Sequence, residues 1–167
     1  MAMSPSPEPS SGGVARRAAA SVTTMTEYVL PTHANALGNV FGGQIMAWMD
    51  LCAAICSQRH TGRVCVTVGI DDLCFQEPIQ VGQVVKLEAR VTAAFRTSLE
   101  IEVQVYGEDA PTGRTWPCVS ALFTFVAVDS SGTPTAVPPL LVSTEEERRN
   151  LEAASARRQR RLSKRAS

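Results

Sequence analysis

The sequence lacks several features that would place the protein in a particular class. It contains no run of about 18 or more uncharged apolar residues, so it predicts no span through a membrane. Its five cysteines are an odd number, none of them forms a CxxC pair, and no hydrophobic signal segment precedes the domain. These absences argue against a secreted, disulfide-bonded protein and favour a reducing, cytoplasmic location.

Ligands for a metal ion are equally scarce. The only histidines, His33 and His60, lie far apart, and Cys52 and Cys56 fall within an apolar helical run. A structural zinc site needs His and Cys ligands clustered at short spacings, and a phosphate-binding loop needs Gly-Lys-Ser/Thr after its glycines. Neither pattern occurs, so we expect no metal and no nucleotide cofactor.

The two signs of charge are unevenly distributed along the chain. The 16 basic residues balance 16 acidic ones, but residues 144–167 hold eight Lys/Arg and four Asp/Glu, so this tail is +4 and the remainder −4. The remainder offers no general surface for polyanions, and we expect no nucleic-acid partner. The basic tail is the one segment whose charge would suit nucleic acid.

A chain of 167 residues has room for one domain. Residues 1–21 are rich in Ser, Pro, Ala and Gly, and this composition predicts a disordered leader. The folded domain is expected over 22–130. Residues 131–167 then form a linker and a charged C-terminal helix or tail, whose helix begins with acids in its first turn.

The expected elements within the domain are one early helix and a series of strands. Residues 42–57 are apolar around almost the whole circumference, which predicts a helix buried on most sides. Strict alternation predicts half-buried strands over 84–91 and 98–106. Further strands are expected over 64–70, 73–75 and about 116–128. This order predicts an α+β fold, in which an antiparallel sheet packs one helix on one face.

Two features of the helical segment have chemical potential. Asp50 stands inside the apolar run, where an unpaired carboxylate is costly to bury and can serve a function. Alternatively, Asp50 occupies one narrow exposed strip of the helix. Gly42 and Gly43 lie at the expected helix start, where free N–H groups suit an oxyanion. Alternatively, these glycines only permit turns and close packing.

The ordered segments resemble the acyl-CoA hydrolase branch of the hotdog-fold thioesterases. The resemblance covers roughly residues 24–129 and rests on four blocks, THANALGNVFGGQIMAWMD, GRVCVTVGIDDLCFQEPIQVGQVV, FRTSLEIEVQVYGE and ALFTFVAVD. It implies a hotdog fold, with the antiparallel sheet wrapped around the central helix. It also implies side-by-side homodimers, which commonly assemble into a trimer of dimers.

The resemblance implies roles for individual residues. The catalytic acid of the family falls on Asp50, and its catalytic amide falls on Asn35. Arg96, Thr97 and Ser98 match a loop near the coenzyme A site, although Phe95 replaces the glycine of that loop. Arg96 suits a phosphate, because a guanidinium fork matches phosphate oxygens. The alternative for Arg96 is a solvated arginine in a hairpin turn.

The resulting hypothesis is an acyl-CoA thioesterase that releases a fatty acid and coenzyme A. Asp50 acts as general base or as nucleophile, Asn35 orients the water or the thioester, and the Gly43 amide polarises the carbonyl. One alternative is a non-catalytic acyl-CoA-binding regulator. Another is a hotdog enoyl-CoA hydratase, but the sequence shows no Asp and His dyad.

Overall fold

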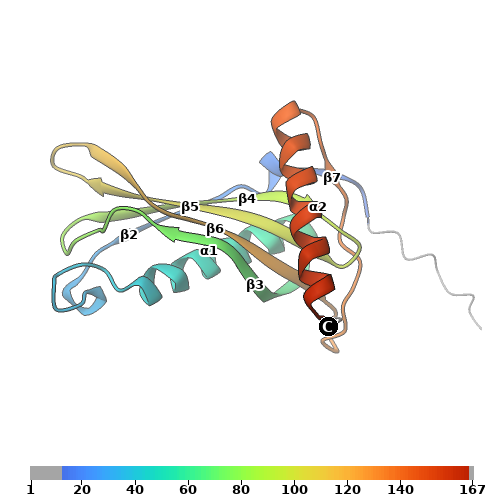
Figure 1. Cartoon of the computed structure of the whole chain (residues 1–167), viewed down its shortest axis with the longest axis horizontal. Coiled ribbons are helices and arrows are strands. Elements are labelled where there is room, and N and C mark those ends of the chain that lie inside the picture. The colour runs from blue at the N-terminus through green and yellow to red at the C-terminus, as the bar shows by residue number, and fades with distance from the viewer. Residues whose placement is uncertain (1–12, 166–167) are drawn as a thin grey trace, which may run out of the picture.

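The structure of the chain is a computed structural model that describes residues 13–165. Figure 1 shows its elements, which follow one another as β1 (Arg16–Arg17), η1 (Ala18–Ala20), β2 (Thr23–Tyr28), η2 (Pro31–His33), α1 (Gly42–Thr61), β3 (Val64–Phe75), β4 (Val84–Ala94), β5 (Ser98–Asp109), β6 (Arg114–Val128), β7 (Leu140–Leu141) and α2 (Glu145–Arg165). The predicted α+β class is confirmed.

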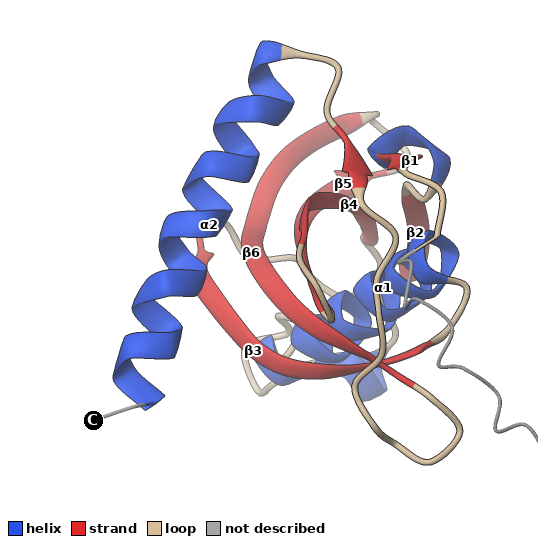
Figure 2. Ribbon diagram, turned by 90° about the vertical axis from the view of Figure 1, so that its right-hand side faces the viewer, coloured by secondary structure: helices blue, strands red, loops and turns tan. Residues whose placement is uncertain are grey.

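Five antiparallel strands form the main sheet in the order β2-β4-β5-β6-β3. Helix α1 contacts all five strands and lies on one face of the sheet (Figure 2). This arrangement is the hotdog architecture that the sequence resemblance implies. The strand β3 is at an edge, so one of its sides has no neighbouring strand among the described residues.

Alternating side chains of the central strands build the core against α1. On β5, Leu99, Ile101 and Val103 are fully buried, and register pairs Leu99 with Phe125 and Ile101 with Phe123 on β6. The alternation predicted for 84–91 and 98–106 is therefore confirmed. The core also contains Met49 of α1, which is 0% exposed.

Two features of the sheet differ from the sequence-based prediction. The two short strands expected over 64–70 and 73–75 are one continuous strand, β3, interrupted by register shifts at Thr67/Gly69 and Asp71/Cys74. The strand β2 was not predicted, because its sequence TTMTEY contains few apolar residues. It forms because it pairs with β4 over its whole length.

The N-terminal segment departs from the expected disordered leader over residues 13–21. Arg16 and Arg17 pair in parallel with Leu140 and Leu141, and Ala18 is only 2% exposed. The expectation is therefore wrong for this stretch, because a distant segment supplies the pairing partner. Residues 1–12 lie outside the part that the structure describes.

The C-terminal helix α2 packs on the face of the sheet opposite α1 (Figures 1 and 2). Arg157 binds the carboxylate of Glu100 on β5 through Nε at 3.0 Å and Nη2 at 2.7 Å. Glu100 is 0% exposed and also accepts a hydrogen bond from Thr92. Arg161 forms a second ion pair with Asp71 on β3. The tail is thus part of the fold and not only a solvated helix.

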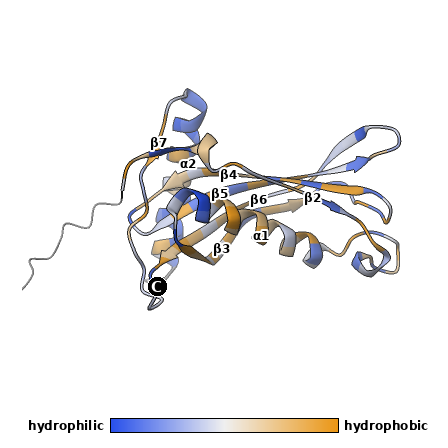
Figure 3. Cartoon of the chain, turned by 180° about the vertical axis from the view of Figure 1, so that it is seen from behind, coloured by the Kyte–Doolittle hydropathy of each residue, from blue (hydrophilic) through white to orange (hydrophobic). Residues whose placement is uncertain are grey.

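One face of α1 stays exposed in the single chain, although the sequence predicted burial on most sides. Leu51 is 54% exposed and Ile55 39%, and the neighbouring edge strand adds Val64 at 62% and Val66 at 44%. Figure 3 shows hydrophobic residues concentrated in the sheet and α1, and hydrophilic residues in α2 and the β5–β6 hairpin. We call the exposed surface of Leu51, Ile55, Val64 and Val66 the apolar strip.

No helix within residues 13–165 is long and apolar enough to cross a membrane.

Candidate active site

The residues predicted to act chemically lie around α1 and at its N-terminal approach. Asn35 occupies a tight turn in which its side-chain Oδ1 accepts hydrogen bonds from the N–H of Leu37 at 2.9 Å and of Asn39 at 3.2 Å. Gly38 completes the turn with φ of 76°, a conformation that favours glycine. The carbonyl side of the Asn35 amide is therefore occupied, and its NH₂ group remains as a donor.

The helix start provides further donors. Phe41 precedes α1 and makes no side-chain cap, and within the described residues neither the Gly42 nor the Gly43 N–H donates to a carbonyl. An added Cβ at Gly43 would meet nothing within 4 Å, so space beside it is open. Two free N–H groups at the positive end of a helix suit a developing oxyanion.

An open pocket of about 320 Å³ adjoins this helix start. One side of its lining is apolar and consists of Val40, Ile45, Phe75, Pro78, Ile79 and Cys118, while Asn35, Asn39, Gln76 and Glu77 are polar and Gly42 adjoins the helix start. The apolar side suits a hydrocarbon chain.

The thiol in this pocket is not a nucleophile. Burial raises the pKa of Cys118 to about 11, and its side chain is 0% exposed. At neutral pH the thiolate is therefore about one part in ten thousand of this cysteine. A carboxylate is therefore a better candidate than this thiol for the nucleophile or base of a reaction.

Asp50 lies two turns further along α1, next to the apolar strip. Its Oδ1 accepts a hydrogen bond from the Thr67 hydroxyl of β3 at 2.6 Å, and the side chain is half-buried. The sequence left open whether Asp50 is buried or lies on an exposed strip, and the structure places it between these two alternatives. Sequence reasoning missed Thr67, because a threonine in a strand has no distinguishing pattern.

Asp50 and Gly43 share one face of α1 but do not share one pocket in the single chain. Asp50 does not line the pocket beside Asn35 and Gly42. Seven residues separate Gly43 from Asp50, which corresponds to a rise of roughly 10 Å along the helix. One thioester cannot easily contact both groups on the same helix.

The predicted coenzyme A loop lies at the opposite end of the sheet. Thr97 and Ser98 line a groove of mixed polarity, and the backbone carbonyl of Thr97 accepts a hydrogen bond from the Ala127 N–H near the β3 start. Arg96 is exposed in the turn between β4 and β5 and does not line the groove. Arg96 therefore does not contribute to the groove that Thr97 and Ser98 line.

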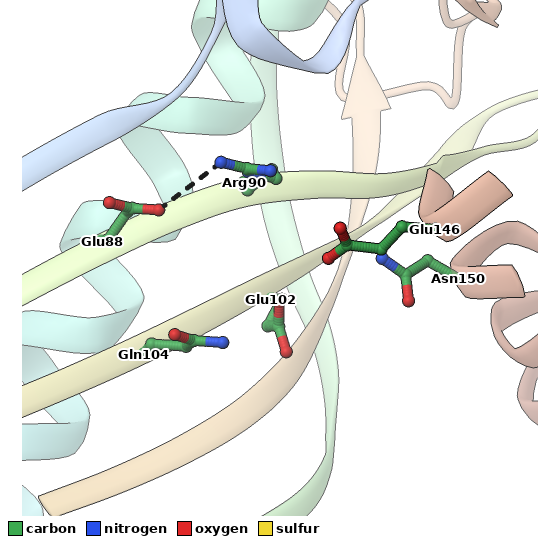
Figure 4. Close-up of a pocket in the computed structure, with 6 residues that line it drawn as sticks. All are labelled: Glu88, Arg90, Glu102, Gln104, Glu146 and Asn150. Atoms are coloured by element: carbon green, nitrogen blue, oxygen red, sulfur yellow. Dashed lines mark ion pairs between the residues drawn. The ribbon is translucent and has the colours of Figure 1, made fainter. Parts of the chain in front are cut away.

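A further hollow on the outer face of the sheet is acidic. Figure 4 shows Glu88, Glu102 and Glu146 around it, with Arg90 paired to Glu88 at 3.8 Å. Carboxylates repel a phosphate-bearing substrate. This hollow is therefore no candidate for a substrate that contains coenzyme A.

Both histidines have structural surroundings. The Nδ1 of His33 accepts the Leu30 N–H at 3.2 Å, and its ring packs edge-on against Trp48 with centroids 5.0 Å apart. His60 is 0% exposed, and its Nε2 lies 3.0 Å from the Pro138 carbonyl oxygen. Neither ring contacts Asp50, so no Asp and His dyad is formed.

Comparison with known proteins places the chain in a family. A model of the thioesterase superfamily matches residues 37–113. An uncharacterized acyl-CoA thioester hydrolase of Zymomonas mobilis is 39% identical over 111 residues, which cover 66% of this chain and 74% of that protein. This chain belongs to the thioesterase superfamily, in the group whose members are named acyl-CoA thioesterases and thioester hydrolases.

Longer animal proteins match as well. The acetyl-coenzyme A thioesterase of Mus musculus is 36% identical over 138 residues, which cover 83% of this chain and 25% of that protein. The chain thus spans about a quarter of the length of these curated relatives.

Solved structures share the whole fold. A hexameric acyl-CoA thioesterase superposes with a TM-score of 0.85 at 38% identity, covering 92% of this chain and 98% of that chain. An acyl-CoA hydrolase of Staphylococcus aureus in complex with butyryl coenzyme A and coenzyme A gives 0.81 at 30% identity, covering 90% and 92%. Alanine variants of that hydrolase replace an aspartate, an asparagine 15 positions before it and a threonine 17 positions after it.

Proposed function

We propose that this chain hydrolyses acyl-CoA thioesters to a carboxylic acid and coenzyme A. Two observations support the proposal together. Asn35, Asp50 and Thr67 have the spacings of the three residues that were replaced in the Staphylococcus aureus hydrolase. The Thr67 hydroxyl also contacts the Asp50 carboxylate directly. This contact is the observation that most favours a catalytic Asp50.

Asp50 supplies the base or the nucleophile. The hydrogen bond from Thr67 occupies one carboxylate oxygen and orients the other. As a base, the free oxygen removes a proton from water while the water attacks the thioester carbonyl. As a nucleophile, it attacks that carbonyl itself and forms a mixed anhydride, which water then hydrolyses. In both routes the C–S bond breaks and coenzyme A leaves as a thiolate, which needs no strong acid.

Asn35 and Gly43 act as donors. The Asn35 Oδ1 already accepts two backbone N–H groups, so its NH₂ orients the attacking water or the thioester through their oxygen atoms. The Gly43 N–H polarises the carbonyl oxygen as negative charge develops on it. Gly42 and the apolar side of the pocket next to it hold the acyl chain.

Each active site is shared between two subunits of a homodimer. The apolar strip supports this arrangement, because exposed apolar surface of this kind marks an association site. If two α1 helices cross a twofold axis in antiparallel directions, the Gly43 end of one lies near Asp50 of the other. We further propose a trimer of dimers, and the hexameric state of two thioesterases with similar structures supports a hexamer.

Arg96, Thr97 and Ser98 belong to the coenzyme A site in this proposal. The reaction needs no metal and no cofactor, since coenzyme A is part of the substrate and the product. Five cysteines without disulfides suit a reducing cytoplasm.

A thiol-release assay with acyl-CoAs from acetyl to palmitoyl tests the function. At least one of them is expected to be hydrolysed after treatment with a chelator. The variant Asp50→Asn should retain the fold and lower kcat by about a hundredfold or more, in line with the loss of an acid-base group. Glu102→Gln on the outer face is the matched control, and its kcat should equal that of the parent. A folded Asp50→Asn variant with unchanged kcat contradicts the proposed role.

A further inference from the structure

The groove beneath the C-terminal half of α2 has features of an anion site. It has a volume of about 180 Å³ and lies between β3, the β4–β5 turn, β6 and α2. Two arginines of α2, Arg158 and Arg161, line it together with the hydroxyl residues Thr97, Ser98 and Thr124. Cationic side chains and hydroxyl donors therefore converge on one small volume from three separate elements.

Thr124 lacks a partner in this groove. It is only 6% exposed, and its Oγ1 makes no hydrogen bond within the described residues. Burying a hydroxyl without a partner is unfavourable, so native proteins rarely leave one unpaired. A ligand oxygen in the groove would accept this hydrogen bond.

Arg158 is the cation available to such a ligand. Its guanidinium lies over the ring of Phe95, with Cζ 4.9 Å from the ring centroid. Within residues 13–165 it forms no ion pair and no hydrogen bond. Stacking fixes the plane of a guanidinium and leaves its N–H edge free to bind two phosphate oxygens.

The nearby carboxylates do not cancel this charge. Glu100 is bound by Arg157, and Asp71 is bound by Arg161. Both acids are therefore neutralised by arginines other than Arg158. Asp72 is exposed and does not line the groove. The remaining charge in the groove is positive.

We propose that this groove binds a phosphate group, with Arg158 as its main charged partner and Thr97, Ser98 and Thr124 as hydroxyl donors. The groove lies on the outer face of the sheet, whereas Thr67, the residue before Val68 on the same edge strand, contacts Asp50 on the face that packs α1. A ligand that reaches both must therefore pass the exposed edge of β3. The phosphate is assigned to the nucleotide end of coenzyme A, and this assignment rests on the proposed function.

Titration calorimetry with coenzyme A and, separately, with inorganic phosphate tests the groove without requiring turnover. The variants are Arg158→Gln and Thr124→Val, and the control is Arg160→Gln, which removes the same charge from an exposed position on α2 outside the groove. Thr124→Val should not lower the melting temperature, because the buried hydroxyl that it removes has no partner. A loss of affinity in this variant would therefore come from the lost hydroxyl and not from a less stable fold.

The Kd of coenzyme A should rise at least about tenfold in Arg158→Gln, as expected for the loss of charged hydrogen bonds, and should also rise in Thr124→Val. Arg160→Gln should bind like the parent. In turnover, Arg158→Gln should lower the ratio of kcat/KM for an acyl-CoA to kcat/KM for the corresponding acyl-pantetheine, which has no nucleotide.

The outcomes separate the possible sources of the phosphate. If only inorganic phosphate loses affinity in Arg158→Gln, the groove binds free phosphate and the assignment to coenzyme A is wrong. If neither ligand loses affinity, the groove is not a phosphate site. If the parent hydrolyses no acyl-CoA, the proposed function fails, yet the two titrations still decide whether the groove binds phosphate.

Discussion

Thr67 of β3 donates its hydroxyl to Oδ1 of Asp50 on α1 across 2.6 Å. The two residues are 17 positions apart and belong to different elements. A carboxylate within the apolar stretch of α1 is thereby held in one orientation beside the exposed edge strand. The contact gives Asp50 the fixed geometry that a base or a nucleophile requires.

Replacing Thr67 tests that geometry. Thr67→Val keeps the shape of the side chain and removes the donor, so kcat for a hydrolysed acyl-CoA should fall about tenfold or more, as expected for the loss of a hydrogen bond to a charged group. Thr67→Ser retains the hydroxyl and should keep most of the activity. Equal kcat values for Thr67→Val and Thr67→Ser would show that the hydroxyl has no part in catalysis.

The shared site predicts complementation between two inactive variants. Asn35→Ala and Asp50→Ala are unfolded together and refolded, so that mixed dimers form. Each mixed dimer has one intact site and one doubly altered site, so a random mixture should recover about a quarter of the parent activity. Mass spectrometry establishes that mixed dimers are present. If they are present and activity stays at the level of the single variants, both residues act within one subunit.

The buried ion pair under α2 predicts a large effect on stability. Arg157→Ala leaves the Glu100 carboxylate buried without its charged partner, so the free energy of unfolding should fall by about 3–5 kcal/mol. Denaturant titration measures the change. The control Arg149→Ala, on an exposed residue of the same helix, should stay within about 0.5 kcal/mol of the parent.

A double variant checks the cause of that loss. Glu100→Leu combined with Arg157→Met removes both charges, so it should recover much of the stability lost in Arg157→Ala. A double variant as unstable as Arg157→Ala would show that packing, and not the unpaired carboxylate, determines the effect.

His60 predicts a dependence of stability on pH. Burial lowers the pKa of this histidine, and Arg16 adds to the effect. Below the unfolded pKa of about 6.5 the unfolded chain binds the proton more readily than the native one, so stability falls as the pH falls through this value towards the lower native pKa. Above it, the histidine is neutral in both states and its contribution is constant.

The variant His60→Gln isolates this contribution. The difference in unfolding free energy between the parent and His60→Gln should shrink between pH 7.5 and 5.5, by at most about 1.4 kcal/mol for each pH unit below 6.5. Denaturant titrations at several pH values measure it. A difference that does not depend on pH would mean that His60 keeps an ordinary pKa in the folded protein.

The periodicity of the sequence determined the class of the fold and most of its elements. The strands around Leu99, Ile101 and Val103 were predictable because alternation reports a half-buried strand without knowledge of its neighbours. The helix beginning at Gly42 was predictable for a similar reason. Asp50 was singled out because a charged residue in an apolar run is conspicuous, and Asn35 because of its place in a family motif.

Only the tertiary structure decided the contacts between distant segments. Thr67 could not be recognised as the partner of Asp50, since the packing of β3 against α1 brings them together. The strand β2 and the folded residues 13–21 depend on pairing with β4 and β7, which no local pattern reveals. Likewise, Arg158 and Thr124 line one groove only because α2 docks on the outer face of the sheet. Local patterns reflect the period of an element, whereas these sites arise from the register and packing between elements.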